Sequence, residues 1–377
     1  MKKFLITIIF GTRPEAIKFA PIILKLKSCN DLDTRIILTG QHIEMVSQVL
    51  ELFGIEANQN FELMKEKQSL NYITSQVVNR LQKEFIANRP DLVLVQGDTT
   101  SAFAASLSAF YNKIPIGHVE AGLRTKTLHE PFPEEANRRL ISQITSLHFA
   151  PSKQSITNLK EYKVQGHVYL TGNTVIDAML HVAKNSKLPD LKGVSWNKNK
   201  VILSTIHRRE NWGVNLKNIA LGILKVLNNH KDVVFLMPLH KNKIIREPLL
   251  DLLSDNPRVI MTNPFNYDYL VGVIKKCYLV LTDSGGLQEE APSLGKPVLV
   301  LRNTTERIEA IDSGTAKLVG TDPEKIYSEV SNLLNNEYEY NLMARSINPY
   351  GDGKASEKII YHCKSYLEGR RIEDQLD

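Results

Sequence analysis

Short apolar runs alternate with amphipathic segments along the whole chain. In its first half the runs that have the length and composition of buried strands are Phe4–Phe10, Thr34–Leu38, Leu92–Gln96, Ile116–Val119, Leu147–Ala150 and Val168–Leu170. Helical spacing of apolar residues lies between these runs, at Ala16–Lys27, His42–Phe53, Ser69–Phe85, Thr100–Tyr111 and from Asn173 to about Val182. Strands that alternate with helices in this way indicate βαβ units and a parallel sheet.

The same alternation resumes after a polar stretch. Residues 183–199 are polar and contain Pro189 and Gly193, a composition typical of a linker. The strand-like runs that follow are Val201–Ser204, Val233–Met237, Val259–Met261, Leu279–Thr282 and Val298–Leu301. The pattern predicts an N-terminal domain over 1–182 and a C-terminal domain over 200–353. We expect the C-terminal segment 354–377, with a final helix at Lys354–Leu367, to pack back on the first domain.

The expected fold class is therefore α/β, with two doubly wound Rossmann-like domains that face one another across a cleft. A chain of 377 residues with 42% hydrophobic residues is too long for a single core and suits two domains. Ligands of doubly wound sheets bind beyond the carboxyl ends of the strands. The cleft is thus the expected binding site.

The charge, the cysteines and the apolar runs limit which partners and which cellular compartment are expected. The formal net charge is +6, but Lys and Arg are spread along the chain without a basic run, so we expect no nucleic-acid partner. Cys29, Cys277 and Cys363 are too far apart for a zinc or disulfide framework. The apolar start, Met1–Phe10, lacks a cleavage site, and no run reaches the roughly 20 apolar residues of a membrane span. We expect a cytoplasmic protein without a membrane partner.

Charged residues follow the strands of the first domain. Asp98 comes after Leu92–Gln96, Glu120 comes directly after Ile116–Val119, and Glu134 and Arg138 lie in the stretch that follows. These charges occur at strand ends and in turns with Gly or Pro, and not at helical i, i+4 spacing. We expect them to gather in one crevice and to act on a charged ligand, because a core does not tolerate unpaired charge. A surface network of salt bridges is the alternative.

The first strand runs into Gly11-Thr-Arg-Pro14, which resembles a phosphate-binding turn before a helix. It has a single glycine and so fails as a dinucleotide fingerprint, which argues against a nicotinamide cofactor. Arg13 and Lys18 remain as cations near a helix start, where they are either solvated charges or ligand contacts.

In the second domain, Leu281–Glu290 is the most informative stretch. A buried strand is followed by Asp283, Ser284, Gly285 and Gly286 at a helix start, which is suited to binding an anion. Glu290 lies about two turns further on, where a carboxylate can accept both hydroxyls of a ribose. A plain β-turn-α corner is the alternative.

Two histidines of the second domain are candidates for the site. His207 follows the first strand of the domain, where it can act as an acid, a base or a phosphate contact. His240 follows Val233–Met237 and is the weaker candidate, because it can simply cap the turn.

With these residues in view, the chain resembles the non-hydrolysing UDP-N-acetylglucosamine 2-epimerases almost from end to end. The motifs that carry the resemblance are Gly11–Ala16, Gln96–Thr99, His118–Arg124, Pro131–Arg138, His207–Asn211, Asp283–Glu290 and Thr304–Arg307. The resemblance implies the two-domain fold of the B-type glycosyltransferases. It also implies a cytoplasmic homodimer that interconverts UDP-GlcNAc and UDP-ManNAc for polysaccharide precursor synthesis, with no cofactor and no metal.

The resemblance further implies roles for individual residues. Asp98, Glu120, Glu134 and His207 match the catalytic positions of the family. The residues that match substrate-binding positions are Arg13, Lys18, Arg138, Leu270, Ser284, Gly285, Gly286, Glu290 and Arg307. Those that match an allosteric UDP-GlcNAc site of some bacterial members are Gln41, Glu44, Lys67, Gln68, Glu134, Arg208 and His240.

The chain departs from the family pattern at a few positions. Leu270 stands where members place a Phe against the uracil, with Tyr269 beside it, and Ile308 stands where a Pro is usual. Glu44 and Lys67 replace the common Gln and Arg, and Lys lacks the bidentate fork of Arg, so we expect weak or absent allosteric activation. Alternative functions are a 2-epimerase of another UDP-2-acetamido sugar, such as a 6-deoxy-L-hexosamine, a hydrolysing epimerase, a glycosyltransferase and a sugar-nucleotide sensor.

Overall fold

The computed structural model describes residues 3–40, 43–64 and 68–370. The chain divides into two compact units, the first made of the described parts of 1–178 and 350–377, the second of 179–349. The division falls within helix α7 (Thr174–Ala183), before the stretch 183–199 in which the sequence predicts the linker. Each unit contains one parallel sheet with helices on both faces, which confirms the predicted α/β class with two Rossmann-like domains.

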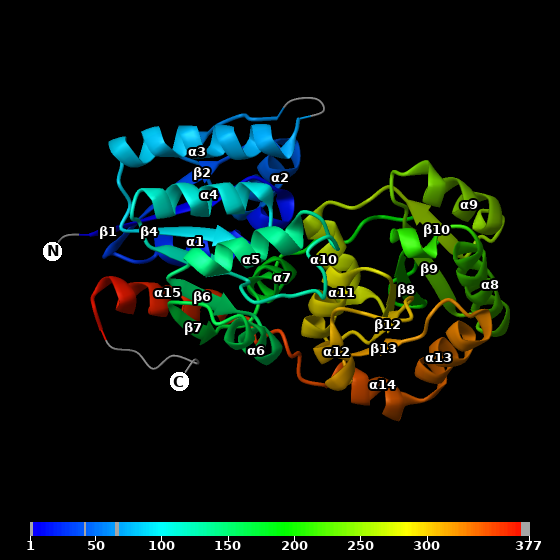
Figure 1. The fold of residues 1–377 in the computed structure, drawn as a ribbon. Coiled ribbons are helices and arrows are strands. Elements are labelled where there is room, and N and C mark those ends of the chain that lie inside the picture. The colour runs from blue at the N-terminus through cyan, green and yellow to red at the C-terminus, as the bar shows by residue number, and fades with distance from the viewer. Residues whose placement is uncertain (1–2, 41–42, 65–67, 371–377) are drawn as a thin grey trace. The chain divides into compact units, whose positions relative to one another are not determined.

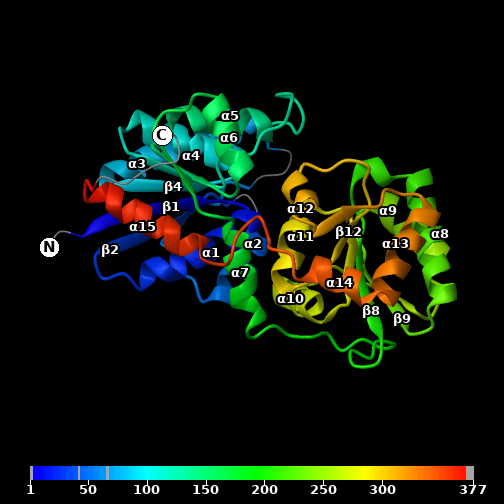
Figure 2. The same cartoon turned by 90° about the horizontal axis from the view of Figure 1, so that it is seen from below.

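The sheet of the first unit has the strand order β3-β2-β1-β4-β5-β6-β7. Its strands are β1 (Phe4–Phe10), β2 (Leu32–Leu38), β3 (Gln59–Asn60), β4 (Leu92–Gln96), β5 (Ile116–Val119), β6 (Leu147–Ala150) and β7 (His167–Leu170). Besides α7, its helices are α1 (Arg13–Lys27), α2 (Ile43–Phe53), α3 (Leu70–Ala87), α4 (Thr100–Tyr111), α5 (Glu134–Ile144), α6 (Lys153–Glu161) and α15 (Ala355–Leu367). Helices α3 and α4 cover one face of the sheet, and α1 and α15 cover the other (Figures 1 and 2).

The core of the first unit explains this arrangement. Alternate strand residues, such as Ile9, Val93 and Val95, pack against α3 and α4. Small buried residues of α4, such as Ala102 and Ala105, let this helix approach the sheet closely. Apolar burial of this kind stabilises the fold by about 25 cal/mol per Å² of area removed from water.

The C-terminal helix α15 belongs to the first unit. Its start is held by Asp177 of α7, whose carboxylate accepts hydrogen bonds from the backbone N–H of Ala355 and from the backbone N–H and hydroxyl of Ser356. Lys25 of α1 pairs with Glu357 at 2.5 Å. Chain segments that are distant in sequence therefore complete one compact body.

The sheet of the second unit has the order β10-β9-β8-β11-β12-β13. Its strands are β8 (Lys200–Thr205), β9 (Val233–Pro238), β10 (Val259–Thr262), β11 (Leu279–Thr282), β12 (Val298–Val300) and β13 (Ala316–Leu318). Its helices are α8 (Val214–Asn229), α9 (Lys243–Leu253), α10 (Tyr267–Lys276), α11 (Gly285–Glu290), α12 (Ile308–Asp312), α13 (Pro323–Asn335) and α14 (Glu337–Ala344), with short 3-10 helices at Arg209–Asn211 and Ala291–Leu294. Helices α8, α9 and α13 cover one face, and α10 and α11 cover the other (Figure 2).

Both sheets are wound in the same way. Counted from the first strand of each unit, the spatial order in both begins 3-2-1-4-5-6, the order of a dinucleotide-binding Rossmann sheet. The order of the strands therefore reverses between β1 and β4 in the first unit and between β8 and β11 in the second. Parallel sheets of this kind bind ligands at the carboxyl ends of these strand pairs.

Two predicted features differ from the structure. The prediction lacked β3 and β13, which are only two and three residues long. It also placed the charges of residues 134–139 in turns without helical spacing. This was wrong, because these residues begin α5. Pro131 and Pro133 suggested turns, but a proline fits just before a helix, where its missing N–H costs nothing.

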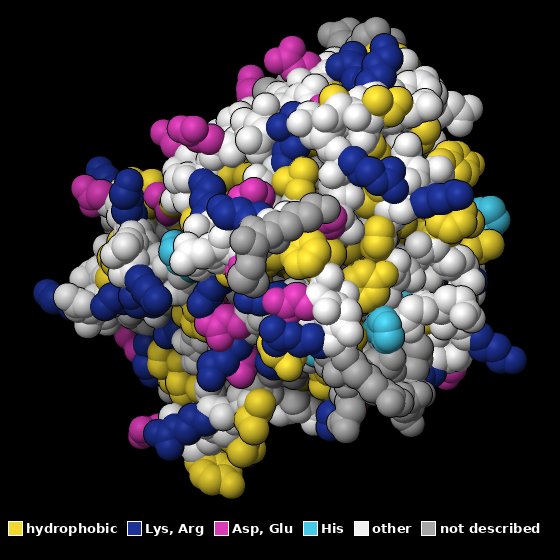
Figure 3. Space-filling view, turned by 90° about the vertical axis from the view of Figure 1, so that its left-hand side faces the viewer, with side chains coloured by type: hydrophobic (Ala, Val, Ile, Leu, Met, Phe, Trp, Pro, Cys, Tyr) yellow, Lys and Arg dark blue, Asp and Glu magenta, His cyan; other side chains and the backbone are white. Residues whose placement is uncertain are grey.

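The surface of the first unit is mixed in charge. On the face shown in Figure 3, lysine and arginine side chains are interspersed with carboxylates and apolar side chains. Within the described ranges, no helix is both long enough and apolar enough to cross a lipid bilayer.

Candidate functional site

Glu15 connects the loops that follow β1 and β4. Its fully buried carboxylate accepts hydrogen bonds from the backbone N–H of Gly11 (3.0 Å) and of Thr12 (2.8 Å) and from the hydroxyls of Thr12 and Thr99 (both 2.7 Å). Burial raises the pKa of Glu15, and the hydrogen bonds from Gly11, Thr12 and Thr99 oppose this effect. The predicted site lacks Glu15, although Thr12 and Glu15 have the spacing of a capping box, the signal that could have found it.

Glu120 lies at the carboxyl end of β5 and is only 8% exposed. Its Oε1 accepts hydrogen bonds from Lys18 Nζ at 2.5 Å and from Asn173 Nδ2 at 3.0 Å, and its Oε2 accepts one from Gln96 Nε2. The φ angle of Glu120 is +64°, a left-handed conformation that costs a non-glycine residue about 1–2 kcal/mol. Strained backbone of this kind is concentrated at functional sites.

Asp98 follows β4 and lies close to Glu120. Its Oδ2 is 3.0 Å from Arg138 Nη2, and its backbone carbonyl accepts a hydrogen bond from Asn137 Nδ2 at 2.9 Å. Gly97 precedes Asp98 and packs beside Glu120, since its φ is +68° and a Cβ atom on it would lie 3.5 Å from Glu120 Oε2. Burial raises the pKa of Asp98, and the negative charges of Glu120 and Glu134 act in the same direction against Arg138 and Lys18.

Helix α5 delivers the charged residues that the sequence had suggested lie in turns. Arg138 reaches Asp98, and it lies 3.6 Å from Glu135, which in turn pairs with Arg139 at 2.6 Å. Oε2 of Glu134 is buried and has no hydrogen-bond partner within the described part of the chain. A buried carboxylate oxygen without a partner is costly and marks Glu134 as a candidate ligand contact.

In the second unit, His207 and Asp283 meet where β8 and β11 end. His207 Nδ1 lies 2.9 Å from Oδ1 of Asp283. The carboxylate of Asp283 also accepts hydrogen bonds from the backbone N–H groups of His207 and Arg208 and from Asn211 Nδ2. Burial raises the pKa of Asp283, but the hydrogen bonds and charge of His207 outweigh burial and leave this pKa below its usual value. Because a carboxylate only accepts, Nδ1 of His207 carries a proton, and Nε2 is the nitrogen that can exchange one.

Arginines and carboxylates form a network beside the start of α11. Glu306 pairs with Arg208 at 3.1 Å and with Arg302 at 2.6 Å, and Arg307 pairs with Glu289 at 2.6 Å. A Cβ atom on Gly285 would lie 3.2 Å from Glu306 Oε1 and 3.4 Å from Arg208 Nη2, so this network lies against the glycine turn. Burial opposes ionisation of Glu306, but Arg307 and Arg302 outweigh it and lower the pKa of Glu306 to about 2.

The other predicted site residues are placed as follows. In the first unit, Arg13 begins α1 and Glu44 lies on the exposed face of α2, while Gln68 precedes α3. In the second, Leu270 lies on α10, Ser284 caps α11, Gly286 and Glu290 belong to α11, and His240 follows β9 with its ring 6.4 Å from that of His207. Gln41 and Lys67 lie outside the described residues.

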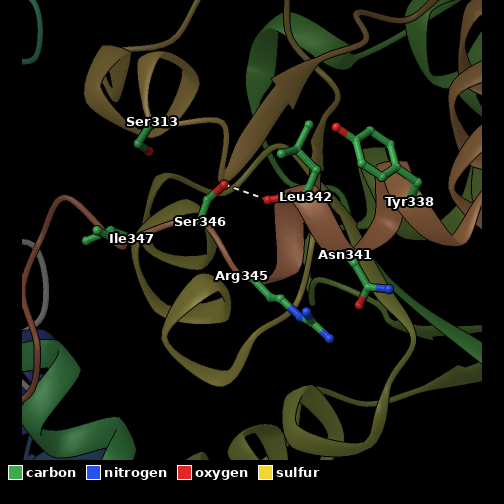
Figure 4. Close-up of a pocket in the computed structure, with 7 residues that line it drawn as sticks. All are labelled: Ser313, Tyr338, Asn341, Leu342, Arg345, Ser346 and Ile347. Carbon is green, nitrogen blue, oxygen red and sulfur yellow. Dashed lines mark hydrogen bonds between the residues drawn. The ribbon is translucent and has the colours of Figure 1, made fainter.

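The second unit also has a surface pocket away from these residues. It measures about 620 Å³ and is lined by Ser313, Tyr338, Asn341, Leu342, Arg345, Ser346 and Ile347 (Figure 4). Its single charged side chain is that of Arg345, and none of the predicted site residues lines it. The pocket therefore lacks the acids and bases that a reaction needs, and the strand ends remain the better candidate site.

The described residues contain no cluster of His, Cys, Asp and Glu side chains that could hold a metal ion. The groups that can take part in chemistry are instead carboxylates and arginines in both units and His207 in the second. They suit proton transfer and the binding of an anion.

The fold and these sites define a two-domain Rossmann-like α/β enzyme. A family model described as UDP-N-acetylglucosamine 2-epimerase matches residues 24–364. The chain belongs to this family, which confirms the resemblance based on its sequence motifs.

Named relatives match over nearly the full chain. The UDP-N-acetylglucosamine 2-epimerase of Bacillus subtilis is 46% identical over 362 residues, or 96% of this chain and 95% of the relative. The crystal structure of the Neisseria meningitidis UDP-GlcNAc 2-epimerase bound to UDP-GlcNAc is 46% identical, with a TM-score of 0.86 over 96% of this chain and 100% of that one. The Methanocaldococcus jannaschii enzyme in complex with UDP-GlcNAc and UDP is 33% identical, with a TM-score of 0.77 over 96% and 99% of the two chains.

Proposed function

We propose that this protein is a non-hydrolysing UDP-N-acetylglucosamine 2-epimerase, which interconverts UDP-GlcNAc and UDP-ManNAc in the cytoplasm. Its relatives of this name are similar to it over nearly their whole length. The structural observation that carries the assignment of residues is the pair of carboxylates at the ends of β4 and β5, Asp98 and Glu120, each of which is paired with a cation.

The reaction must invert a carbon that is not acidic. The C2–H bond of the hexosamine is adjacent to no carbonyl group, so simple removal of its proton is very unfavourable. If a base takes this proton while the C1–O bond breaks, the C–H electrons form the C1=C2 bond of 2-acetamidoglucal and UDP leaves as an anion. Re-addition of UDP at C1, with protonation of C2 on the other face, gives the epimer. No oxidant or reductant is consumed.

The first unit supplies the groups proposed to act on the sugar. Asp98 is the candidate to remove or return the C2 proton, because its raised pKa makes it a stronger base once it is ionised. Glu120 or Glu134 is the group proposed to stabilise positive charge that develops at C1 as the C–O bond breaks. The positive charges of Lys18 and Arg138 reduce the repulsion among these carboxylates. Both residues are also proposed to contact the sugar or the diphosphate.

The second unit supplies the groups proposed to hold UDP. Backbone N–H groups at Ser284–Gly286 and the guanidinium of Arg307 stabilise the diphosphate as it gains negative charge. Glu290 accepts the ribose hydroxyls, and Leu270 contacts the uracil where family members have an aromatic ring. Arg13, which begins α1, is a further cation proposed to contact the diphosphate.

His207 is the second candidate for proton transfer. Asp283 fixes its ring and its tautomer, so Nε2 is in the state needed to exchange a proton. A positioned acid or base of this kind contributes about 10²–10⁴-fold to a rate. Loss of either Asp98 or His207 should reduce kcat by an amount in this range.

The proposal includes a homodimer. Phe110 and Tyr111 at the end of α4 are 52% and 67% exposed, and both line one surface pocket together with Ile144 of α5. Large apolar side chains gathered on one surface suit contact with a second copy of the chain. A mass of twice 42.6 kDa in light scattering is expected, and Tyr111→Glu should shift it toward that of the monomer.

The experiment that tests the function is incubation of the purified protein with UDP-GlcNAc in the absence of any added cofactor. We expect the anomeric proton signals of UDP-GlcNAc and UDP-ManNAc to reach a constant ratio, approached from either substrate. Free ManNAc with UDP would instead identify a hydrolysing enzyme. Conversion of only a 6-deoxy-UDP-hexosamine would reassign the sugar.

A further inference from the structure

The loop that carries Asp98 is anchored by side chains as well as by the sheet. The parallel ladder between β4 and β5 ends with a hydrogen bond from the N–H of Gly97 to the carbonyl of Val119 at 3.0 Å. Beyond this point, two consecutive backbone carbonyls accept hydrogen bonds from side chains. That of Gly97 accepts from His118 at 2.7 Å, and that of Asp98 accepts from Asn137 at 2.9 Å.

The ring of His118 makes one hydrogen bond within the described structure, the one to the carbonyl of Gly97. It is completely buried on β5, two residues before Glu120. Because a carbonyl oxygen can only accept, the proton of the ring is on Nε2, and Nδ1 is buried without a partner in the described structure. Burial lowers the pKa of His118 to about 3, so the ring is neutral at neutral pH and cannot serve as a proton donor or base there.

The contact determines where two carboxylates lie. His118 is on β5 and Glu120 follows the last residue of this strand, so the bond to Gly97 ties the loop of Asp98 to the strand that carries Glu120 at its end. Gly97 itself is in the left-handed region and packs beside Glu120 Oε2. A change in this loop therefore changes the distance between the Asp98 and Glu120 carboxylates.

We propose that His118 is a positioning residue, which holds the Gly97–Asp98 turn so that the Asp98 carboxylate stays at the distance from Glu120 that the reaction requires. The inference rests on the proposed function, in which Asp98 transfers the C2 proton. Displacement of a reacting group by about 1 Å costs on the order of 10²-fold in rate. The bond from His118 acts on kcat, because it holds the turn of Asp98 and reaches none of the residues 284–290 and 307 that are proposed to hold UDP.

The chain contains a matched control in His148. It lies opposite His118 in the register of β5 and β6 and is equally buried. Its Nε2 lies 2.8 Å from the carbonyl of Gln165, in a loop that carries none of the proposed site residues. Burial lowers its pKa as well, to about 4. Loss of either bond removes one buried contact, but only that of His118 reaches Asp98.

The test compares His118→Met with His148→Met in the full-length protein, with His118→Gln as the variant that keeps a donor near the position of Nε2. We expect His118→Met to lower kcat by about 10- to 100-fold, with KM and the Kd for UDP within about twofold of wild type. His118→Gln should recover a large part of the rate. His148→Met should lower the melting temperature as much as His118→Met and keep kcat near the wild-type value.

Several results would overturn the inference. Wild-type kcat in His118→Met, or an equal loss of kcat in His148→Met, would show that His118 is an ordinary core residue. If His118→Met does not fold, Asn137→Ala decides, because it removes the neighbouring bond to Asp98 from the helical position 137, where alanine is favourable. Wild-type kcat in Asn137→Ala would then count against positioning of the turn. Absence of epimerase activity in the wild type would instead reject the proposed function.

Discussion

His207 Nδ1 lies 2.9 Å from Oδ1 of Asp283, although the two residues are 76 positions apart in the sequence. Pairing of β8 with β11 brings them together, since Thr205 and Thr282 at the ends of these strands are partners in register. The partly exposed histidine and the fully buried carboxylate thus form a pair in which Asp283 orients His207, the residue that we propose transfers a proton. The geometry is that of a histidine prepared for proton transfer.

Asp283→Asn tests this relationship. An amide can donate to Nδ1 and so favour the opposite tautomer of His207, and kcat should fall by about 10²-fold. The measurement is the initial rate of epimerisation together with a thermal melt. Asp177→Asn is the matched control, because Asp177 is another buried carboxylate that accepts two backbone N–H groups and a hydroxyl. It should lower stability but leave kcat unchanged, and equal losses of kcat in both variants would contradict the role of Asp283.

Asp98→Asn should lower the activity but raise the stability of the protein at pH 7.5. The folded-state pKa of Asp98 is raised above the usual value of 3.8, so the folded state binds this proton more tightly than the unfolded state does. The free energy of unfolding therefore decreases as pH rises through the folded-state pKa. The neutral amide avoids this decrease. Asp98→Asn should have a higher melting temperature than wild type at pH 7.5, a difference that disappears below about pH 4. Its kcat should be lower by about 10²–10⁴-fold. A lower melting temperature at pH 7.5 would contradict the account of the pKa.

Glu306 should contribute stability with the opposite pH dependence. Its pKa is lowered from 4.5 to about 2, so its ionised form is favoured in the folded state. This stability is fully present above about pH 4.5 and is lost as pH falls toward 2. Denaturant unfolding of Glu306→Gln should show a deficit against wild type at pH 7 that shrinks between pH 4.5 and 3. The exposed Glu324, which pairs with Lys225, contributes less than about 1 kcal/mol, so Glu324→Gln should show little deficit at any pH. A deficit of Glu306→Gln that does not depend on pH would argue against the ionic network.

Regulation by UDP-GlcNAc should be weak or absent. Glu44 adds negative charge, and Lys67 lacks the fork with which Arg binds a phosphate in a bidentate manner. The initial rate should follow a hyperbolic dependence on UDP-GlcNAc concentration, and UDP-ManNAc should be converted without added UDP-GlcNAc. Sigmoidal kinetics that Gln68→Ala or His240→Ala makes hyperbolic would contradict this expectation.

The strands were largely predictable because they are buried and apolar. The bounds of β1, β4, β5, β6 and β11 agree with the runs read from the sequence. The strands β3 and β13 were not predictable in this way, because two or three residues carry too little periodicity.

The helix α5 shows why local sequence alone misled. Pro131 and Pro133 predict turns, while the packing of Ile141 and the pairing of Arg138 with Asp98 depend on tertiary structure. Helical spacing was nevertheless present in the ion pair between Glu135 and Arg139.

The charged residues at strand ends were predictable, but most of their partners were not. Asp98, Glu120 and His207 were predicted as candidate site residues because each follows a strand. Asn173, Asn137 and Asp283 bond to these residues from distant segments, so only the order of the strands brings them into contact. His118 was visible only as part of a motif, because its bond to a backbone carbonyl leaves no sequence signal.

The most direct test of the central claim is the fate of the hydrogen at C2 when UDP-GlcNAc is converted in heavy water. If Asp98 and His207 exchange the proton during elimination and re-addition of UDP, the UDP-ManNAc formed carries deuterium at C2, seen as loss of the C2 proton signal and a gain of one mass unit. UDP-ManNAc that keeps its original hydrogen at C2 would contradict the account.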